Sequence, residues 1–126
     1  MIPTDLRDTR EHEWVRVEDG VATVGITAHA ADQLGDIVFV ELPAVGTAVS
    51  AGKTFGVVES VKAVSDLFAP VSGSVLETNG ELGGSPELAN SDPFGAGWMI
   101  RISVADAGEL DALLDAAAYE KLVAEG

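Results

Sequence analysis

The chain has 126 residues, no cysteine, and 21 acidic against 7 basic residues, which give a net charge of −14. The length fits a single domain, residues 1–126, while the lack of cysteine excludes disulfides, thiolate metal sites and thiol catalysis. The charge disfavours nucleic acid and anionic membranes as partners, and no apolar run approaches the ~18–20 residues of a membrane span. Because the N-terminal residues are acidic and lack an apolar segment, we expect a soluble, cytoplasmic protein.

The first part of the chain predicts a β-hairpin. Residues 14–18 (WVRVE) and 21–26 (VATVGI) both alternate along the chain, which places Val15 and Val17 on one face of the first strand. The Asp-Gly pair between the two strands is a strong hairpin signal.

A short helix and a strand follow. Thr27 is a suitable N-cap and Gly35 a suitable stop for a helix between them. Residues 36–42 (DIVFVEL) are apolar on both faces, as expected for a strand that is buried on both sides, and Pro43 ends it.

The second half of the chain predicts further strands. Residues 55–68 form a long apolar stretch, residues 74–78 a short strand, and residues 98–104 (WMIRISV) an alternating strand with Trp98 facing the core. Glycine-rich loops separate the last two strands, together with one helical turn opened by Ser85-Pro86.

The C-terminal tail is predicted to be helical. Asp106 and Glu109 form a capping-box pattern, and apolar residues then recur at helical spacing. Asp115 is a suitable cap for a second helix, so the pattern leaves one helix or two open. The order of elements predicts a mainly β fold, a small sandwich or flattened barrel, with a β core at about 14–104 and a helical tail at about 106–125.

The sequence lacks the patterns of most catalytic and metal sites. His12 and His29 occur without thiolates or an HExxH spacing, so we expect surface residues and not metal ligands. No GxSxG elbow is present, and the AGKT sequence at residues 51–54 lacks both the upstream glycine and the following helix of a phosphate-binding loop. We therefore predict no metal site and no catalytic serine.

Lys62, one of only three lysines, lies at the centre of the long apolar stretch with Glu59 and Asp66 nearby. Three hypotheses account for it: a surface lysine paired with one of these acids, a catalytic amine that forms imines, or an exposed attachment point at a hairpin tip. The acids argue against a catalytic amine because they favour the ammonium form. Local chemistry alone favours the ion pair, since the sequence VKA contains no turn residue and predicts a continuous strand.

Six segments together resemble the glycine cleavage system H protein family. They are HEWV at 12–15, VGIT at 24–27, QLGDIVFVELP at 33–43, GVVESVKAVSDL at 56–67, APVSG at 69–73 and GWMI at 97–100. The resemblance covers nearly the whole chain, and the combination of ESVKAVSD with GDIVFVELP is highly specific. It implies a lipoyl-domain-like hybrid barrel-sandwich of short antiparallel strands, with a short internal helix and a C-terminal helical segment.

The resemblance implies a non-catalytic carrier. In this family the lysine that matches Lys62 carries lipoate in amide linkage at a hairpin tip, attached by a lipoate ligase or a lipoyl/octanoyl transferase. The carrier takes the aminomethyl group of glycine from a pyridoxal-phosphate glycine decarboxylase (P protein) to an aminomethyltransferase (T protein), and then electrons to a dihydrolipoyl dehydrogenase (L protein). The alternative is a lipoyl relay protein for 2-oxoacid dehydrogenase complexes. An enzyme that uses Lys62 as an imine nucleophile is the hypothesis from another class.

The resemblance also implies further site residues. The loaded arm is expected in a cleft near Glu13 and Asp66, whose carboxylates can accept hydrogen bonds from its ammonium group. Gln33 stands where some family members have histidine, so a histidine role in the cleft is not carried over. Glu59 is expected to belong to the surface that the lipoate-attaching enzyme recognises.

Overall fold

The computed structural model describes residues 6–125, with the backbone alone at 107 and 125. Within this range the strands, in chain order, are β1 (Arg7–Asp8), β2 (Glu13–Glu18), β3 (Val21–Ile26), β4 (Ile37–Glu41), β5 (Ala48–Val49), β6 (Thr54–Ser60), β7 (Val64–Phe68), β8 (Gly73–Thr78) and β9 (Ile100–Val104). The helices are α1 (Ala28–Leu34), α2 (Glu81–Gly84), α3 (Leu88–Ser91), the 3-10 helix η1 (Ala107–Ala112) and α4 (Ala116–Glu125).

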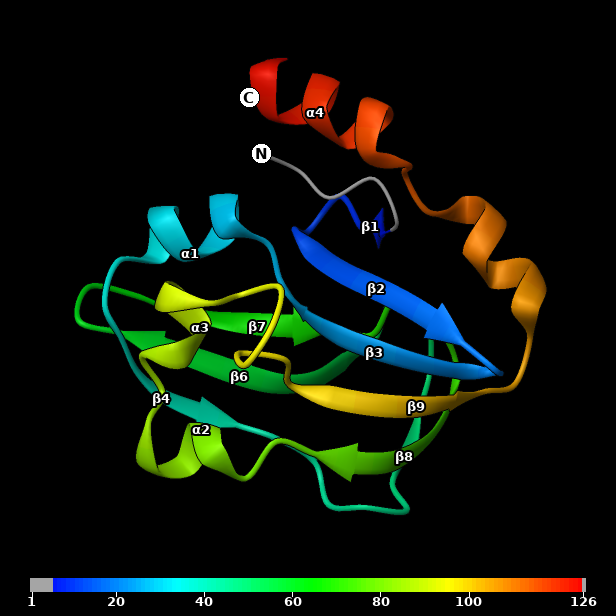
Figure 1. Cartoon of the computed structure of the whole chain (residues 1–126), viewed down its shortest axis with the longest axis horizontal. Helices are drawn as coiled ribbons and strands as arrows, with labels where there is room; N and C mark the ends of the chain where they lie inside the picture. The colour runs from blue at the N-terminus through cyan, green and yellow to red at the C-terminus, as the bar shows by residue number, and fades with distance from the viewer. Residues whose placement is uncertain (1–5, 126) are drawn as a thin grey trace.

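The described strands form two antiparallel sheets that face each other (Figure 1). One has six strands in the order β1-β2-β3-β9-β8-β5, and the other has three in the order β4-β6-β7. The mainly β fold with a helical tail is therefore confirmed, and the two sheets form a sandwich that does not close into a barrel.

The core lies between the two sheets. Buried aliphatic side chains from both sheets meet there, among them Val15, Val24, Val58 and Ile102. Each such side chain contributes roughly 1.5–3 kcal/mol when it leaves water. This core fixes the β6–β7 hairpin relative to the rest of the molecule.

The first hairpin and the first helix have the local signals that the sequence predicts. Asp19 and Gly20 have φ angles of 51° and 77°, as a tight turn between β2 and β3 requires. Thr27 caps α1, since its side chain accepts a hydrogen bond from the Ala30 N–H (3.2 Å), and Gly35 ends the helix at a φ of 79°.

The expectation that β4 is buried on both sides is wrong. Only Ile37 and Val40 are buried, whereas Val38 and Phe39 are 53% and 51% exposed. The register of β4 against β6 shifts between Ile37 and Phe39, which interrupts the alternation of the strand. Neither sheet covers the outer face of β4, so apolar residues there remain at the surface.

Trp98, which was expected to face the core, and Val17, which was expected to share a face with Val15, both lie close to the surface. Val17, near the end of β2, is 38% exposed although Val15 on the same strand is buried. Trp98 precedes β9 and is only half-buried, and the Arg101 guanidinium stacks over its ring at 4.2 Å.

The segment between β8 and β9 contains more helix than the sequence predicts. The glycine-rich residues 81–84 form α2 and not a loop. The turn that follows Ser85-Pro86 becomes helical only at Leu88, where α3 begins. Both helices are single turns, and residue propensities seldom distinguish a single helical turn from a loop.

The tail contains two helical pieces, which settles the choice that the sequence left open. Asp106 accepts a hydrogen bond from the amide two residues on (2.9 Å) and Asp115 from the amide three residues on (2.8 Å). Glu109 does not complete a capping box; it accepts hydrogen bonds from the Ser72 N–H (2.7 Å) and hydroxyl (2.8 Å) instead. α4 then lies over β1 at the top of Figure 1.

Candidate functional site

Lys62 lies at the tip of the β6–β7 hairpin and not within a continuous strand. Residues 60–63 form the turn beyond the last pair of the two strands. The Ser60 Oγ accepts hydrogen bonds from the N–H groups of Lys62 (3.3 Å) and Ala63 (3.1 Å), and the Ser60 N–H donates to the Ala63 carbonyl (2.8 Å). The serine side chain thus closes the turn, and it lies just outside the VKA sequence in which a turn residue was sought.

The tip is held against neighbouring elements. The Val61 N–H donates to the Asp36 carbonyl (3.0 Å) at the start of β4. The side chain of Lys62 passes Gly35, where an added Cβ would lie 3.4 Å from the Lys62 Cε. Lys62 is exposed, and within residues 6–125 its amine forms no ion pair with the neighbouring acids. The described structure therefore gives the ion-pair hypothesis no support.

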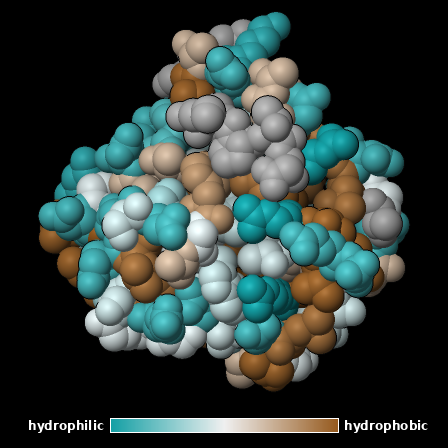
Figure 2. Space-filling model, viewed as in Figure 1, coloured by the Kyte–Doolittle hydropathy of each residue, from teal (hydrophilic) through white to brown (hydrophobic). Residues whose placement is uncertain are grey.

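Exposed apolar side chains surround this tip. Val61 and Val64 are 69% and 65% exposed, and Val38 and Phe39 are exposed on the adjacent β4. Figure 2 shows apolar surface at the left end of the molecule, where Figure 1 places the β6–β7 turn. A protein that approaches Lys62 meets apolar side chains interspersed with acids.

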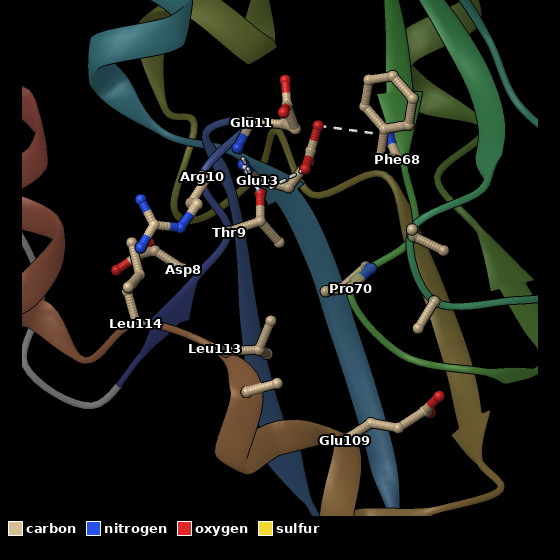
Figure 3. A pocket seen from close by; sticks show the side chains of 14 residues that line it. Asp8, Thr9, Arg10, Glu11, Glu13, Phe68, Pro70, Glu109, Leu113 and Leu114 are labelled. Carbon is tan, nitrogen blue, oxygen red and sulfur yellow. Dashed lines mark hydrogen bonds between the residues drawn. The ribbon is translucent and has the colours of Figure 1, made fainter. Parts of the chain in front are cut away.

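A cleft of about 590 Å³ opens beyond the far end of β7, between the β1–β2 loop and η1 (Figure 3). Its apolar walls come from Ala51, Gly52, Phe68, Ala69, Pro70, Ala112, Leu113 and Leu114, and its polar lining from Asp8, Thr9, Arg10, Glu11, Glu13 and Glu109. The cleft therefore combines a hydrocarbon surface with several carboxylates.

Glu13 is the buried acid of this cleft, with 2% of its surface exposed. Its Oε1 accepts a hydrogen bond from the Thr9 hydroxyl (2.5 Å) and its Oε2 accepts one from the Phe68 N–H (3.3 Å). Burial raises the pKa of Glu13 to about 7; the two hydrogen bonds oppose this rise and the nearby Glu11 adds to it. Glu13 therefore gains or loses its proton near neutral pH.

Asp66, the other predicted cleft residue, lies on the surface of β7 and not in the cleft lining. Side chains alternate along a strand, so Asp66 shares a face with Phe68, which does line the cleft. Asp66 is thus placed along the strand that leads from Lys62 toward Glu13.

Asp8 is an acid that the sequence does not single out. It is completely buried, and neither carboxylate oxygen has a hydrogen-bond partner among the described residues. Burial raises the pKa of Asp8 to about 6. No sequence pattern predicts it, because its burial depends on packing of β1 beneath the C-terminal segment, where Asp8 and Leu114 exchange backbone hydrogen bonds of 2.8 Å.

The two histidines lie together and are partly buried. Their ring centroids are 4.8 Å apart, and the His12 Nδ1 is hydrogen-bonded to the hydroxyl of Tyr119 (2.8 Å) in α4. Burial and then His29 lower the pKa of His12, partly opposed by Glu11. His12 thus helps to attach α4 to the sandwich.

The part of the chain that the structure describes contains no group of three or more histidine, cysteine, aspartate and glutamate side chains arranged to hold a metal ion. None of the helices described there has the length and apolar character needed to cross a membrane.

Known proteins match this chain over nearly its whole length. A family model described as Glycine cleavage H-protein matches residues 6–126. The chain belongs to the glycine cleavage H-protein family. The glycine cleavage system H protein of Carboxydothermus hydrogenoformans is 55% identical over 125 residues, which cover 99% of this chain and 96% of the relative. That of Alteromonas mediterranea is 59% identical over 125 residues, covering 98% and 97%. A crystal structure of the H protein from Mycobacterium marinum aligns with a TM-score of 0.91 at 43% identity, covering 98% of this chain and 99% of the other.

Membership of the family settles the class of function. The chain is a lipoyl carrier of the glycine cleavage system and not an enzyme. The names of these relatives do not favour the relay alternative. Interaction with the other components of glycine cleavage follows from the same membership.

Proposed function

We propose that lipoate is attached to the Nζ of Lys62 and that the cleft at Glu13 receives the loaded arm during glycine cleavage. The observation that carries this proposal is the exposed lysine at the tip of a tethered hairpin, in a chain that matches the family model over residues 6–126. An attaching enzyme needs an accessible amine, and Lys62 is exposed in the turn at residues 60–63. When attached, lipoate supplies a disulfide that accepts the aminomethyl group and later returns as a dithiol for reoxidation.

The cleft suits an arm that is apolar along its length and cationic at its loaded end. Phe68, Pro70 and Leu113 offer apolar contact, and the buried Glu13 offers a carboxylate. Asp66 lies on β7, between the turn that carries Lys62 and the end of the strand at Phe68. We propose that Asp66 borders the path to the cleft and that Glu13 lies at its end.

Glu13 would act as the acceptor for an ammonium group. A cation within about 4–6 Å favours the ionised carboxylate and lowers its pKa, so Glu13, with a pKa of about 7, would release its proton as the cation enters. The walls of the cleft exclude water from the labile aminomethyl group. Both effects belong to the protein and require no catalytic residue.

The proposed partners are the pyridoxal-phosphate decarboxylase, the aminomethyltransferase, the dihydrolipoyl dehydrogenase and a lipoate-attaching enzyme, with the cytoplasm as the compartment. Asp36, Glu59 and Asp66 lie around the tip of the hairpin, and the whole chain has a charge of −14. These acids favour partners with basic patches around their active-site entrances.

The attachment site can be tested by mass spectrometry. Protein from lipoate-supplied cells should carry one lipoyl group, and peptide mapping should place it on Lys62. Lys62→Arg should abolish the modification, whereas Lys53→Arg, a change at another exposed lysine, should leave it intact. Lipoate on the Lys62→Arg protein would exclude the assigned site.

The carrier function can be tested with the purified decarboxylase. The lipoylated chain should support exchange between bicarbonate and the carboxyl group of glycine, and the Lys62→Arg chain should not. Lipoylated protein that supports no exchange would argue against the proposed role of the Lys62 arm.

A further inference from the structure

The hydroxyl of Thr9 lies at the centre of the loop that presents Glu13 (Figure 3). Thr9 Oγ1 accepts hydrogen bonds from the Glu11 N–H (3.2 Å) and the Glu13 N–H (3.1 Å). A hydroxyl oxygen has two acceptor lone pairs and one proton to donate. Both lone pairs are therefore used by the backbone, and the proton is directed to Glu13 Oε1 at 2.5 Å.

We propose that Thr9 is a positioning residue whose hydroxyl holds the Glu13 carboxylate in place as the ammonium acceptor of the cleft. This inference rests on the proposed function of the cleft.

The backbone makes this geometry rigid. The Thr9 N–H donates to the Glu13 carbonyl (2.8 Å) and the Thr9 carbonyl accepts from the His12 N–H (3.1 Å), which closes the loop between β1 and β2. His12 has a φ of 70°, so the loop turns tightly there. The side chains of Thr9 and Glu13 consequently point toward each other in Figure 3.

Two different parts of the chain hold the two oxygens of Glu13. Thr9 in the β1–β2 loop binds Oε1, and the Phe68 N–H at the end of β7 binds Oε2 at the longer distance of 3.3 Å. Fixing both oxygens orients the carboxylate plane. The shorter of the two bonds comes from Thr9, so Thr9 is the stronger of the two restraints.

The hydroxyl also offsets forces that favour a protonated Glu13. Burial raises the pKa of Glu13 and the Glu11 carboxylate raises it further, while the bonds from Thr9 and Phe68 lower it. Other titratable or charged groups that face this site are Asp8, Arg10 and Glu109 in the cleft lining and Tyr119 from α4. Without the Thr9 proton, a larger fraction of Glu13 would be neutral at pH 7, and its ionisation on pairing with an ammonium group would cost more free energy.

The first test uses the unmodified protein and no partner enzyme. Carbon-13 NMR titration of the Glu13 carboxyl should show that Thr9→Val raises the pKa of Glu13 by about one unit, as expected for loss of one hydrogen bond to a charged group. Thr9→Ser, which keeps the hydroxyl, should leave it near the wild-type value. Thr47→Val, at an exposed threonine, is the matched control. An unchanged Glu13 pKa in the Thr9→Val protein would overturn the inference.

The second test separates positioning from a general role in the loop. The lifetime of the aminomethyl group on the isolated loaded protein should fall about tenfold with Thr9→Val, and Thr9→Ser should restore it. In a Glu13→Gln background, Thr9→Val should cause no further loss, because its effect passes through the carboxylate. An equal loss in that background would show that Thr9 acts only through loop shape, which contradicts the inference.

The two proposals fail in different ways. If Glu13→Gln leaves the lifetime of the aminomethyl group unchanged, the cleft does not use this carboxylate. The acceptor role of Glu13 and the positioning role of Thr9 are then both excluded. Attachment at Lys62 would stand in that case, since mass mapping judges it separately.

Discussion

The two buried acids of the described chain differ in how their carboxyl groups are satisfied. Both oxygens of Glu13 accept hydrogen bonds, whereas those of Asp8 have no partner among the described residues. A buried carboxylate without donors is costly, so the ionised form of Asp8 destabilises the fold above its pKa of about 6. At the residue scale, two donors hold the Glu13 carboxylate, whereas no donor among the described residues reaches that of Asp8.

Asp8→Asn should stabilise the protein at neutral pH. The pKa of Asp8 is about 6 in the folded state, above its ordinary value of 3.8, so between these pH values the native state holds a proton that the unfolded state has lost. Stability therefore falls as pH rises from about 4 to 6 and stays lower above that range. A pKa shift of this size corresponds to a loss of roughly 3 kcal/mol in the free energy of unfolding. We expect Asp8→Asn to recover about 1–2 kcal/mol of it after local relaxation.

Urea unfolding between pH 4 and pH 8 checks this prediction. The gain in the free energy of unfolding from Asp8→Asn should be present at pH 7 and absent near pH 4. Asp111→Asn, at an exposed acid of η1, is the control and should show no such pH-dependent gain. Equal gains at both pH values would mean that ionisation of Asp8 is not the cause.

At the scale of elements, hydrogen bonds from single side chains hold the hairpin tip and the C-terminal helix in place. Ser60 closes the turn that carries Lys62. Tyr119, which is 1% exposed, joins α4 to the sandwich because its hydroxyl is hydrogen-bonded to His12 (2.8 Å) and to Thr27 Oγ1 (2.6 Å). Each element depends on a few bonds that a single substitution can remove.

Ser60→Ala should loosen the tip without unfolding the protein. It removes the acceptor for two backbone N–H groups in a surface turn, so global stability should fall by no more than about 1 kcal/mol. Hydrogen exchange at residues 61–63 should become faster, and the rate of lipoate attachment to Lys62 should decrease several-fold. Ser65→Ala on β7 is the control, and equal rates for the two variants would contradict a role for the Ser60 side chain.

Tyr119→Phe should weaken the attachment of α4. The substitution leaves Thr27 Oγ1 and His12 Nδ1 without their shared partner, which should cost about 1–2 kcal/mol. Urea unfolding should show this loss, and amide exchange should increase in α4 before it increases in β3. Unchanged exchange in α4 would mean that apolar packing alone attaches the helix.

Local patterns predicted those elements whose neighbours in the sequence determine them. Asp19 and Gly20 set the first hairpin, and Thr27 and Gly35 set the ends of α1, because each acts through its own backbone or its nearest amides. The β6–β7 turn escaped prediction because Ser60 closes it with a side chain in place of a glycine conformation.

Features that depend on distant residues could not be predicted in this way. Val38 is exposed because neither sheet covers the outer face of β4, and Asp8 is buried because a segment more than a hundred residues later packs on β1. Glu13 was predicted as a site residue only through the family resemblance. No local pattern could show its surroundings, because the hydrogen bond that it accepts from the Phe68 N–H joins residues 55 positions apart. The candidate cleft is thus largely a tertiary feature.

On the scale of the whole molecule, charge and apolar surface coincide at one end. The tip that carries Lys62 has exposed valines and the nearby acids Asp36, Glu59 and Asp66, in a chain with a net charge of −14. η1 lies at the opposite end of the molecule in Figure 1. Partners that act on the arm should therefore be attracted to the tip by charge and held there by apolar contact.

Salt should slow the encounter between this chain and its partners. Raising KCl from about 20 mM to about 200 mM shortens the Debye length several-fold, so kcat/KM for the chain as a substrate of the decarboxylase should fall about tenfold. Asp36→Asn should lower kcat/KM at low salt and flatten this dependence, because it removes a charge beside the tip. Asp111→Asn removes the same charge at the far end and should have a smaller effect. If the two variants behave alike, net charge and not the acidic tip governs the encounter, because a long-range field does not distinguish where a single charge lies.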